Sequence, residues 1–311
     1  MKSIRNLSKI NFALKGRKYV TPDDLSPNEM KYLLLTALDL KASRKNDLSK
    51  QSFVGKNITF LLDSPCIAMQ ACVHNTSSLF KMPVSILISS EWETKPFPQD
   101  TGKLLSTTSD IIFCKAHRQS KLEGFAKGAT VPVINVSSCH FVLLQILSNL
   151  LTLQQHFHNL DGLVIAWIGP PCPLLNTYLT IAPTLGMRVK FLCYSGGPVS
   201  PSHLYKVLSK GDQFVHRVKE SKALAEVIEG AHAIATTDHS ESNLKLKLSD
   251  VEKYADRNWV LFHTLPRTSK EIEDEIFDSE RNLLWTSFSN QKWICAAIIS
   301  KFLGFDENDT I

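Results

Sequence analysis

The 311-residue chain lacks an uninterrupted apolar run of the kind that a membrane-spanning helix needs. About 20 consecutive apolar residues cross a bilayer, and the most apolar stretch, Val142–Leu153, is interrupted by Gln145, Ser148 and Asn149. The chain also lacks a strong charge of one sign, because 35 basic residues are balanced by 30 acidic ones. A surplus of +5, dispersed along the chain, is not typical of nucleic-acid binding. We therefore expect a soluble protein without membrane or nucleic-acid partners.

Paired metal or disulfide motifs are also missing. The seven cysteines are odd in number and none of them forms a Cys-x-x-Cys pair. This pattern argues against a disulfide framework or a zinc ribbon and favours free, buried thiols in a reducing compartment. His156 and His158 are two residues apart, so on a helix they point to different faces. We expect no metal site.

Glycine-rich phosphate turns are absent as well. The strand expected at 163–168 is followed by Gly169-Pro170-Pro171, and prolines offer no amide hydrogen to a phosphate. The turn after an earlier strand, Asp63-Ser64-Pro65-Cys66, leads into a helix and suits an anion site. No Lys or Arg occurs from Asp63 to Phe80. The ligand of that turn is therefore not expected to be a phosphate dianion.

Apolar residues make up 43% of the chain and charged residues 21%, which is typical of a globular protein, and the length favours two domains. Short β-branched runs alternate with helical patterns, which predicts an α/β protein with parallel sheets. The expected strands are 58–62, 84–89, 110–114, 131–136, 163–168, 188–193, 216–218, 233–237 and 259–263. The expected helices are 26–44, 69–80, 100–107, 119–127, 141–157, 174–185, 221–229 and 289–303. The long apolar helix 141–157 is expected to connect the two domains.

The N-terminal segment is basic and contains no acidic residue before Asp23. Its six cations are Lys2, Arg5, Lys9, Lys15, Arg17 and Lys18. This composition is typical of a mitochondrial transit peptide and suggests the mitochondrial matrix. The alternative is a basic tail on a cytoplasmic protein, since the chain reads as folded from Leu14 onward.

Two polar loops follow strands at their carboxyl ends, where open α/β sheets bind ligands. They are Thr237–Ser242 and His263–Arg267. Both are candidate pocket walls, and the alternative is that each merely caps a strand.

The most specific segments of the chain are Leu14–Arg17, Leu151–His156, Trp167–Gly169, Leu261–Arg267 and Asn290–Trp293. With them, nearly the whole chain resembles the ornithine carbamoyltransferases. The resemblance implies two doubly wound α/β domains, here 1–150 and 151–311, with the C-terminal helix packing back on the first domain. It also implies a homotrimer that converts carbamoyl phosphate and L-ornithine to citrulline and phosphate, in arginine biosynthesis and the urea cycle, with no cofactor.

The resemblance fails at most phosphate-binding positions. The family's Ser-Thr-Arg-Thr-Arg motif aligns with Cys66, Ile67, Ala68, Met69 and Gln70. A later arginine aligns with Lys115, which lacks the guanidinium fork. Only Gln145 remains of His-Pro-x-Gln, and a C-terminal arginine aligns with Gln291. At about 1.5–3 kcal/mol for each hydrogen bond to a charged group, the losses remove roughly 5–9 kcal/mol of phosphate binding.

The amino-acid side is partly kept. The family's Asp-x-x-x-Ser-Met-Gly aligns with Asp238, Ser242, Asn243 and Leu244, and a family asparagine aligns with Pro173. His-Cys-Leu-Pro becomes His263, Thr264, Leu265 and Pro266, so Thr264 replaces the thiol at the reaction centre.

Three functions are consistent with this pattern. The first is a pseudoenzyme that binds an amino acid through Asp238 and Ser242, or assembles with an active relative. The second is a working ornithine carbamoyltransferase that recruits cations such as Lys81 or Lys95 of a neighbouring subunit. The third uses a less anionic donor in an apolar pocket of Ile67, Ala68 and Met69. A loop-stabilising hydrogen bond is the structural alternative for Asp238 and Ser242.

Overall fold

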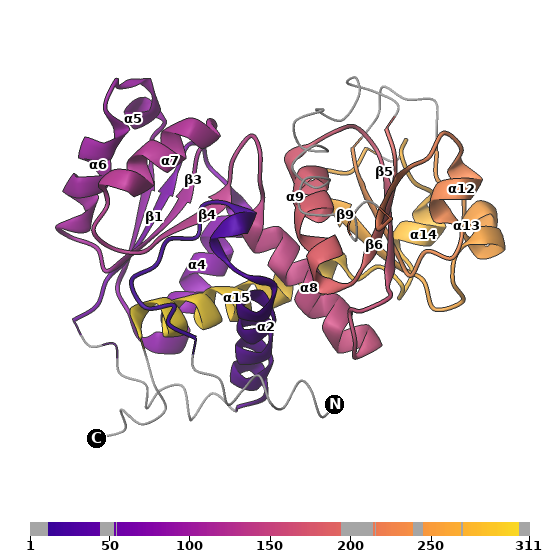
Figure 1. The fold of residues 1–311 in the computed structure, drawn as a ribbon, viewed down its shortest axis with the longest axis horizontal. Helices are drawn as coiled ribbons and strands as arrows, with labels where there is room; N and C mark the ends of the chain where they lie inside the picture. The colour runs from indigo at the N-terminus through magenta and orange to yellow at the C-terminus, as the bar shows by residue number, and fades with distance from the viewer. Residues whose placement is uncertain are drawn as a thin grey trace. The chain divides into compact units, whose positions relative to one another are not determined.

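The computed structural model describes residues 12–43, 53, 55–193, 214, 216–238, 245–268 and 270–304. The chain forms two compact units (Figure 1), one made of Met1–Leu151 with Phe288–Ile311 and the other of Thr152–Ser287. The division falls within helix α8 (Leu143–Phe157) and within helix α15 (Leu284–Leu303). The expected second domain ran to residue 311, but the chain from Phe288 onward belongs to the first unit, on which the C-terminal helix packs.

Unit 1 is built on a parallel sheet with the strand order β2-β1-β3-β4. Its strands are β1 (Ile58–Leu62), β2 (Val84–Ile88), β3 (Ile111–Lys115) and β4 (Val133–Ser137). The runs are apolar rather than alternating because a parallel sheet is covered on both faces. All five residues of β1 are buried, whereas the edge strand β2 is partly exposed.

Unit 1 also contains the helices α2 (Pro27–Ala42), α4 (Ile67–Phe80), α5 (Glu91–Thr94), α6 (Pro98–Ser106) and α7 (Gln119–Gly128), with a 3-10 turn at Pro22–Asp24. The parts of α8 and α15 on its side of the division complete its helices. Helix α2 starts at Pro27 because Ser26 and Glu29 form a capping box, in which the Glu29 amide donates to Ser26 Oγ (3.3 Å). The Ser26 amide donates to Glu29 Oε2 in return (2.7 Å).

Alternate residues of β1 and β3 face opposite sides of the sheet. Phe60 and Phe113 stack with their ring centroids 4.5 Å apart. Leu61 and Cys114 belong instead to a buried cluster that includes Phe125 of α7. Buried side chains therefore pack on both faces of the sheet at β1 and β3.

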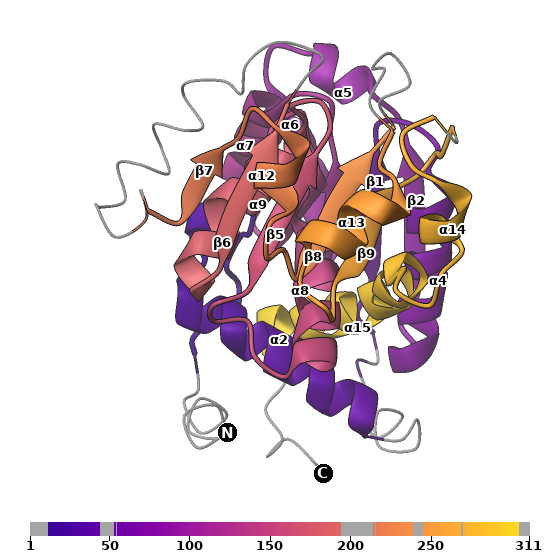
Figure 2. The same ribbon diagram turned by 90° about the vertical axis from the view of Figure 1, so that its right-hand side faces the viewer.

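Unit 2 contains a parallel sheet with the order β7-β6-β5-β8-β9. Its strands are β5 (Val164–Ile168), β6 (Arg188–Leu192), β7 (Val218–Glu220), β8 (Ala233–Thr237) and β9 (Val260–Thr264). Its helices are α9 (Pro173–Ile181), α12 (Leu224–Ile228), α13 (Leu248–Tyr254) and α14 (Asp274–Phe277), with a 3-10 turn at Ala182–Leu185. Figure 2 shows α12 and α13 in front of the sheet and α9 behind it.

Most expected elements differ from the observed ones by one to three residues at an end, and the C-terminal helix differs by five. The strand expected at 216–218 is β7, which starts at Val218 because its pairing with β6 begins at Val218 and Val189. The helix expected at 289–303 starts at Leu284, whose amide donates to Asn282 Oδ1 (3.1 Å). The short helices α5, α13 and α14 were not expected, because four to seven residues are too few to show a helical period.

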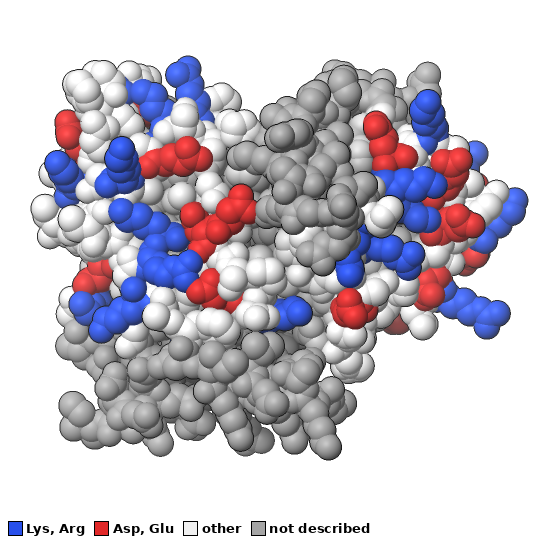
Figure 3. All heavy atoms as spheres, viewed as in Figure 1, with Lys and Arg blue, Asp and Glu red and all other residues white. Residues whose placement is uncertain are grey.

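No helix in the described part of the chain combines the length and the apolar character that a bilayer-spanning segment needs. On the face drawn in Figure 3, basic and acidic side chains are interspersed over the described surface of each unit.

Candidate functional site

In unit 1, the candidate site lies where β1 and β3 end side by side. Leu62 and Lys115 are partners in the register of these parallel strands, so Asp63 emerges next to Lys115. Lys115 Nζ lies 2.6 Å from Asp63 Oδ1 and donates to Ser64 Oγ at 2.7 Å. Ser64 Oγ in turn donates to Asp63 Oδ1 (2.9 Å). The three side chains form a closed network in which the lysine charge is paired.

Asp63 was missed by the sequence reasoning as a partner of Lys115. The Lys115 side chain is 24% exposed and that of Asp63 13% exposed, so the pair is shielded from solvent more than an ordinary surface ion pair. The signal that could have found it is the position of Asp63, directly after a strand expected to lie beside the strand that ends at Lys115. Two charges that leave neighbouring parallel strands at the same edge are close enough to pair.

The turn from Cys66 to Gln70 begins α4. Cys66 is the N-cap residue and makes no capping hydrogen bond with its side chain, while the Gln70 amide donates to the Cys66 carbonyl (2.9 Å). Ile67 is 87% exposed and Ala68 is exposed, but Met69 is buried. Consecutive helical residues point about 100° apart, so these three side chains do not line one apolar surface of this unit.

The two glutamines expected at the phosphate site do come together. Gln291 Nε2 on α15 donates to Gln145 Oε1 on α8 at 2.7 Å. Gln145 Nε2 donates to Asn149 Oδ1, one turn further along α8 (2.9 Å). Gln291 is buried, with 4% of its surface exposed. The two side-chain amides are therefore hydrogen-bonded to each other inside the unit, at positions where the family resemblance places an anion contact.

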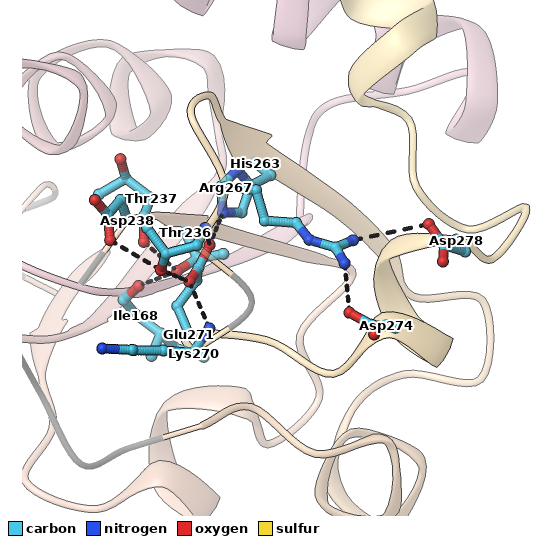
Figure 4. Close-up of polar contacts among 11 residues, drawn as sticks. Ile168, Thr236, Thr237, Asp238, His263, Arg267, Lys270, Glu271, Asp274 and Asp278 are labelled. Atoms are coloured by element: carbon cyan, nitrogen blue, oxygen red, sulfur yellow. Dashed lines mark hydrogen bonds and ion pairs between the residues drawn. The ribbon is translucent and has the colours of Figure 1, made fainter. Parts of the chain in front are cut away.

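In unit 2, the ends of β5, β8 and β9 meet (Figure 4). Thr236 Oγ1 donates to the Ile168 carbonyl at 2.6 Å and ties β8 to β5. Asp238 follows β8, and its Oδ1 lies 3.3 Å from the hydroxyl of Thr268. That hydroxyl lies 2.5 Å from Glu271 Oε2. Because it carries one proton, it donates to one of the two carboxylates at a time.

His263 and Glu271 form a fully buried pair, with 3.0 Å between His263 Nε2 and Glu271 Oε1 and no exposed side-chain surface on either. Glu271 also accepts from the amides of Thr268 (3.0 Å) and Lys270 (3.1 Å). Burial acts to raise the pKa of Glu271, but the hydrogen bonds from Thr268, its own amide and the charge of His263 outweigh it and lower the pKa to about 2. Glu271 is thus ionised, so His263 Nε2 donates a hydrogen bond to Glu271 Oε1.

The remaining residues of the 263–267 loop point elsewhere. Thr264 ends β9 opposite Thr237, and Leu265 is 41% exposed before a cis bond to Pro266. Arg267 extends away from this cluster (Figure 4), where it pairs with Asp274 and lies 3.7 Å from Asp278. Its guanidinium also lies 4.1 Å from the ring centroid of Phe277. Arg267 therefore fastens the loop to α14.

Among the expected amino-acid ligands, Asp238, His263, Thr264 and Leu265 lie at this edge of unit 2, with Asp238 and His263 joined through Thr268 and Glu271. Ser242 and Asn243 lie outside the described residues. Pro173 is the first residue of α9 and follows the N-cap residue Cys172. Thr268 and Glu271 were missed by the sequence reasoning, which stopped at Arg267.

Comparison with known proteins covers both units. A model of the carbamoyl-phosphate-binding domain of aspartate/ornithine carbamoyltransferases matches residues 17–155. A model of the aspartate/ornithine-binding domain of the same family matches residues 161–302. The mitochondrial ornithine transcarbamylase of Gallus gallus is 29% identical over 95% of this chain and 88% of its own length. The mitochondrial ornithine carbamoyltransferase of Aquarana catesbeiana is 26% identical over 93% and 87%.

Solved structures share the fold. The ornithine carbamoyltransferase of Pyrococcus furiosus superposes with a TM-score of 0.85 at 18% identity, over 95% of this chain and all of that chain. The mitochondrial ornithine carbamoyltransferase of Coccidioides immitis gives a TM-score of 0.83 at 23% identity, over 93% and 98%. With both family domains matched in order along one chain, this protein belongs to the aspartate/ornithine carbamoyltransferase family.

Proposed function

We propose that this protein keeps the carbamoyltransferase fold but is a pseudoenzyme, which binds an amino acid in unit 2 and does not transfer a carbamoyl group. The observation that carries the proposal is the ion pair between Lys115 and Asp63 (2.6 Å). Lys115 is the one phosphate-site cation that the family resemblance retains, and its charge is already matched by a carboxylate. A phosphate dianion at this edge would meet a neutral pair rather than a cation.

The expected energetic deficit is large. A hydrogen bond to a charged group contributes about 1.5–3 kcal/mol, and three of the family's arginines are replaced here by uncharged residues. The roughly 5–9 kcal/mol lost on that scale corresponds to at least three orders of magnitude in affinity. The hydrogen bond between Gln291 and Gln145 supports the same conclusion, because Gln291 is one of these uncharged replacements and its amide is already bonded within the unit.

Amino-acid binding is supported by the carboxylates at the edge of unit 2. Asp238 follows β8 and is partly exposed, and the Thr268 hydroxyl lies within hydrogen-bond distance of it. A carboxylate at the carboxyl end of a parallel strand suits the ammonium group of an amino acid such as L-ornithine. His263 helps to hold the loop that carries Thr268, because it contacts Glu271, which accepts a hydrogen bond from the Thr268 amide.

The alternative is a working ornithine carbamoyltransferase. It is favoured by the similarity to the Gallus gallus ornithine transcarbamylase over 95% of this chain. It requires cations from outside this site, such as Lys81 or Lys95 of a neighbouring copy. Lys95 already pairs with Glu91 within its own helix region, at 2.8 Å.

The proposal also covers the oligomeric assembly of the protein and its location in the cell. The protein forms a homotrimer or joins a hetero-assembly with an active relative, as expected for its family. A mitochondrial location is supported by the basic N-terminal segment and by the two mitochondrial relatives.

Isothermal titration with carbamoyl phosphate and with L-ornithine, together with a citrulline assay, tests the proposal. We expect no saturable heat from carbamoyl phosphate, no citrulline, and saturable L-ornithine binding that Asp238→Asn weakens. Glu252→Gln, an exposed carboxylate of α13, is the matched control and should bind as the natural protein does. Citrulline turnover with saturable carbamoyl phosphate binding would establish the working enzyme instead.

A further inference from the structure

Two cysteines of unit 1 are in direct contact, although they are 223 residues apart in the sequence. Cys72 lies on α4 and Cys295 on α15, with 3.8 Å between the two Sγ atoms. Cys72 keeps 6% of its surface exposed and Cys295 keeps none. Of the two residues, Cys72 is therefore the less completely buried.

The surroundings make the two thiols chemically unequal. A hydrogen bond from the Cys295 thiol lowers the pKa of Cys72, and the Thr76 hydroxyl and the charge of Lys292 act in the same direction against the effect of burial. The same hydrogen bond, together with burial, raises the pKa of Cys295 well above its ordinary value. Lys292 lies three residues before Cys295, so both are on one side of α15. Cys72 is thus the better nucleophile, and Cys295 is placed beside it.

We propose that Cys72 and Cys295 form a reversible disulfide when the protein meets hydrogen peroxide. The Cys72 thiolate attacks one oxygen of the peroxide, the O–O bond breaks, and the leaving oxygen takes a proton to become water. The resulting S–O bond of the sulfenic acid then breaks as Cys295 sulfur attacks the Cys72 sulfur. The hydroxyl leaves with the Cys295 proton as a second water, so two thiols lose two electrons and hydrogen peroxide is reduced.

The cross-link would join the two helices that carry candidate site residues. Cys72 follows Met69 by three residues on α4, and Cys295 follows Gln291 by four on α15, so each cysteine lies one turn from a site position. Closing a loop of this length restricts the unfolded chain more than the folded one. Oxidation should therefore lock α4 against α15 and raise the thermal stability of unit 1. This inference does not depend on the proposed function.

The test begins with the natural full-length protein. It is treated with a few equivalents of hydrogen peroxide, unfolded, alkylated with iodoacetamide and weighed by mass spectrometry. We expect alkylation of the seven cysteines to fall to five, one peptide pair linked through Cys72 and Cys295, and full reversal by dithiothreitol. The melting midpoint should rise by several degrees on oxidation and return on reduction.

The variants Cys295→Ser and Cys72→Ala should abolish both the linked peptide pair and the rise in melting midpoint. Cys139→Ser, which removes an exposed cysteine, is the matched control and should change neither result. Full alkylation of both Cys72 and Cys295 after oxidation of the natural protein would overturn the proposal. So would a disulfide between other cysteines, for example Cys172 and Cys193. Because both of these results come from the natural protein, the test remains decisive even if a variant fails to fold.

Discussion

Lys115 Nζ lies 2.6 Å from Asp63 Oδ1, at the place where the parallel strands β3 and β1 end next to each other. The two residues are 52 positions apart in the chain. Their contact joins the loop before α4 to the sheet of unit 1. It also places a carboxylate beside the lysine of the candidate phosphate site. In the proposed function, this pairing adds to the replacement of the family's arginines, because it neutralises the charge of the remaining lysine.

Asp63→Asn should release the Lys115 charge. A lysine freed from its carboxylate can make one charge-assisted contact, which at about 1.5–3 kcal/mol strengthens anion binding roughly tenfold to a hundredfold. Isothermal titration with carbamoyl phosphate and with inorganic phosphate measures this change. Asp110→Asn is the matched control. Asp110 forms a comparable ion pair with Lys56, with 2.7 Å between Oδ1 and Nζ, outside the candidate site. Equal anion affinity in Asp63→Asn and the natural protein would contradict the role given to the ion pair.

Thr264→Cys restores the sulfur that the family resemblance places at the reaction centre. We expect no citrulline from this variant, because the phosphate site still lacks its cations and the added thiol supplies none. A colorimetric citrulline assay at millimolar carbamoyl phosphate and L-ornithine is sufficient, with an active ornithine carbamoyltransferase as the positive control. Turnover above the background of the natural protein would show that the phosphate site remains competent.

The buried Glu271 should make stability depend on acid pH. Its pKa is lowered from about 4.5 to about 2 in the folded protein. The group therefore contributes its stabilisation in full above the unfolded pKa, and the contribution is lost as pH falls from about 4.5 toward 2. The shift corresponds to about 3 kcal/mol at neutral pH. Urea unfolding of the natural protein and of Glu271→Gln between pH 7 and pH 3 measures it.

In that series, Glu271→Gln should be less stable at pH 7 and should lose less stability on acidification. Glu252→Gln, an exposed carboxylate in the same unit, should follow the natural protein at every pH. Parallel pH profiles for the natural protein and Glu271→Gln would show that the carboxylate is not held ionised by Thr268 and His263.

Gln291→Ala should destabilise unit 1. It removes the Nε2 donor that lies 2.7 Å from Gln145 Oε1 in a buried position, and a disrupted buried hydrogen bond costs about 1–3 kcal/mol. Denaturant unfolding should show the loss as a lower midpoint. Gln99→Ala, a partly exposed glutamine of α6 in the same unit, is the control and should change the free energy of unfolding by less. If both variants lose the same amount, the amide pair has no special contribution.

The alternation of apolar runs and helical patterns was sufficient to predict most strands of both sheets, including Ile58–Leu62 and Ala233–Thr237. Local composition decides these elements because a strand buried on both faces must be apolar throughout. The sequence also singled out two candidate site residues, Asp238 from a polar loop after a strand and Lys115 through the family resemblance. Elements with few residues, such as α13 and α14, were not, since one or two turns carry no periodic signal.

The order of residues along the chain is therefore enough to predict the fold class and the types of side chain that stand at the candidate site. The pairing of those side chains depends on how the chain packs in three dimensions. Asp63 meets Lys115, Gln145 meets Gln291, and Cys72 meets Cys295 across separations of 52, 146 and 223 residues. Sheet order and helix packing set these contacts, and neither is encoded in the spacing of the residues along the chain. Charge, hydrogen bonding and thiol chemistry act over a few ångströms in space, whatever the distance along the sequence.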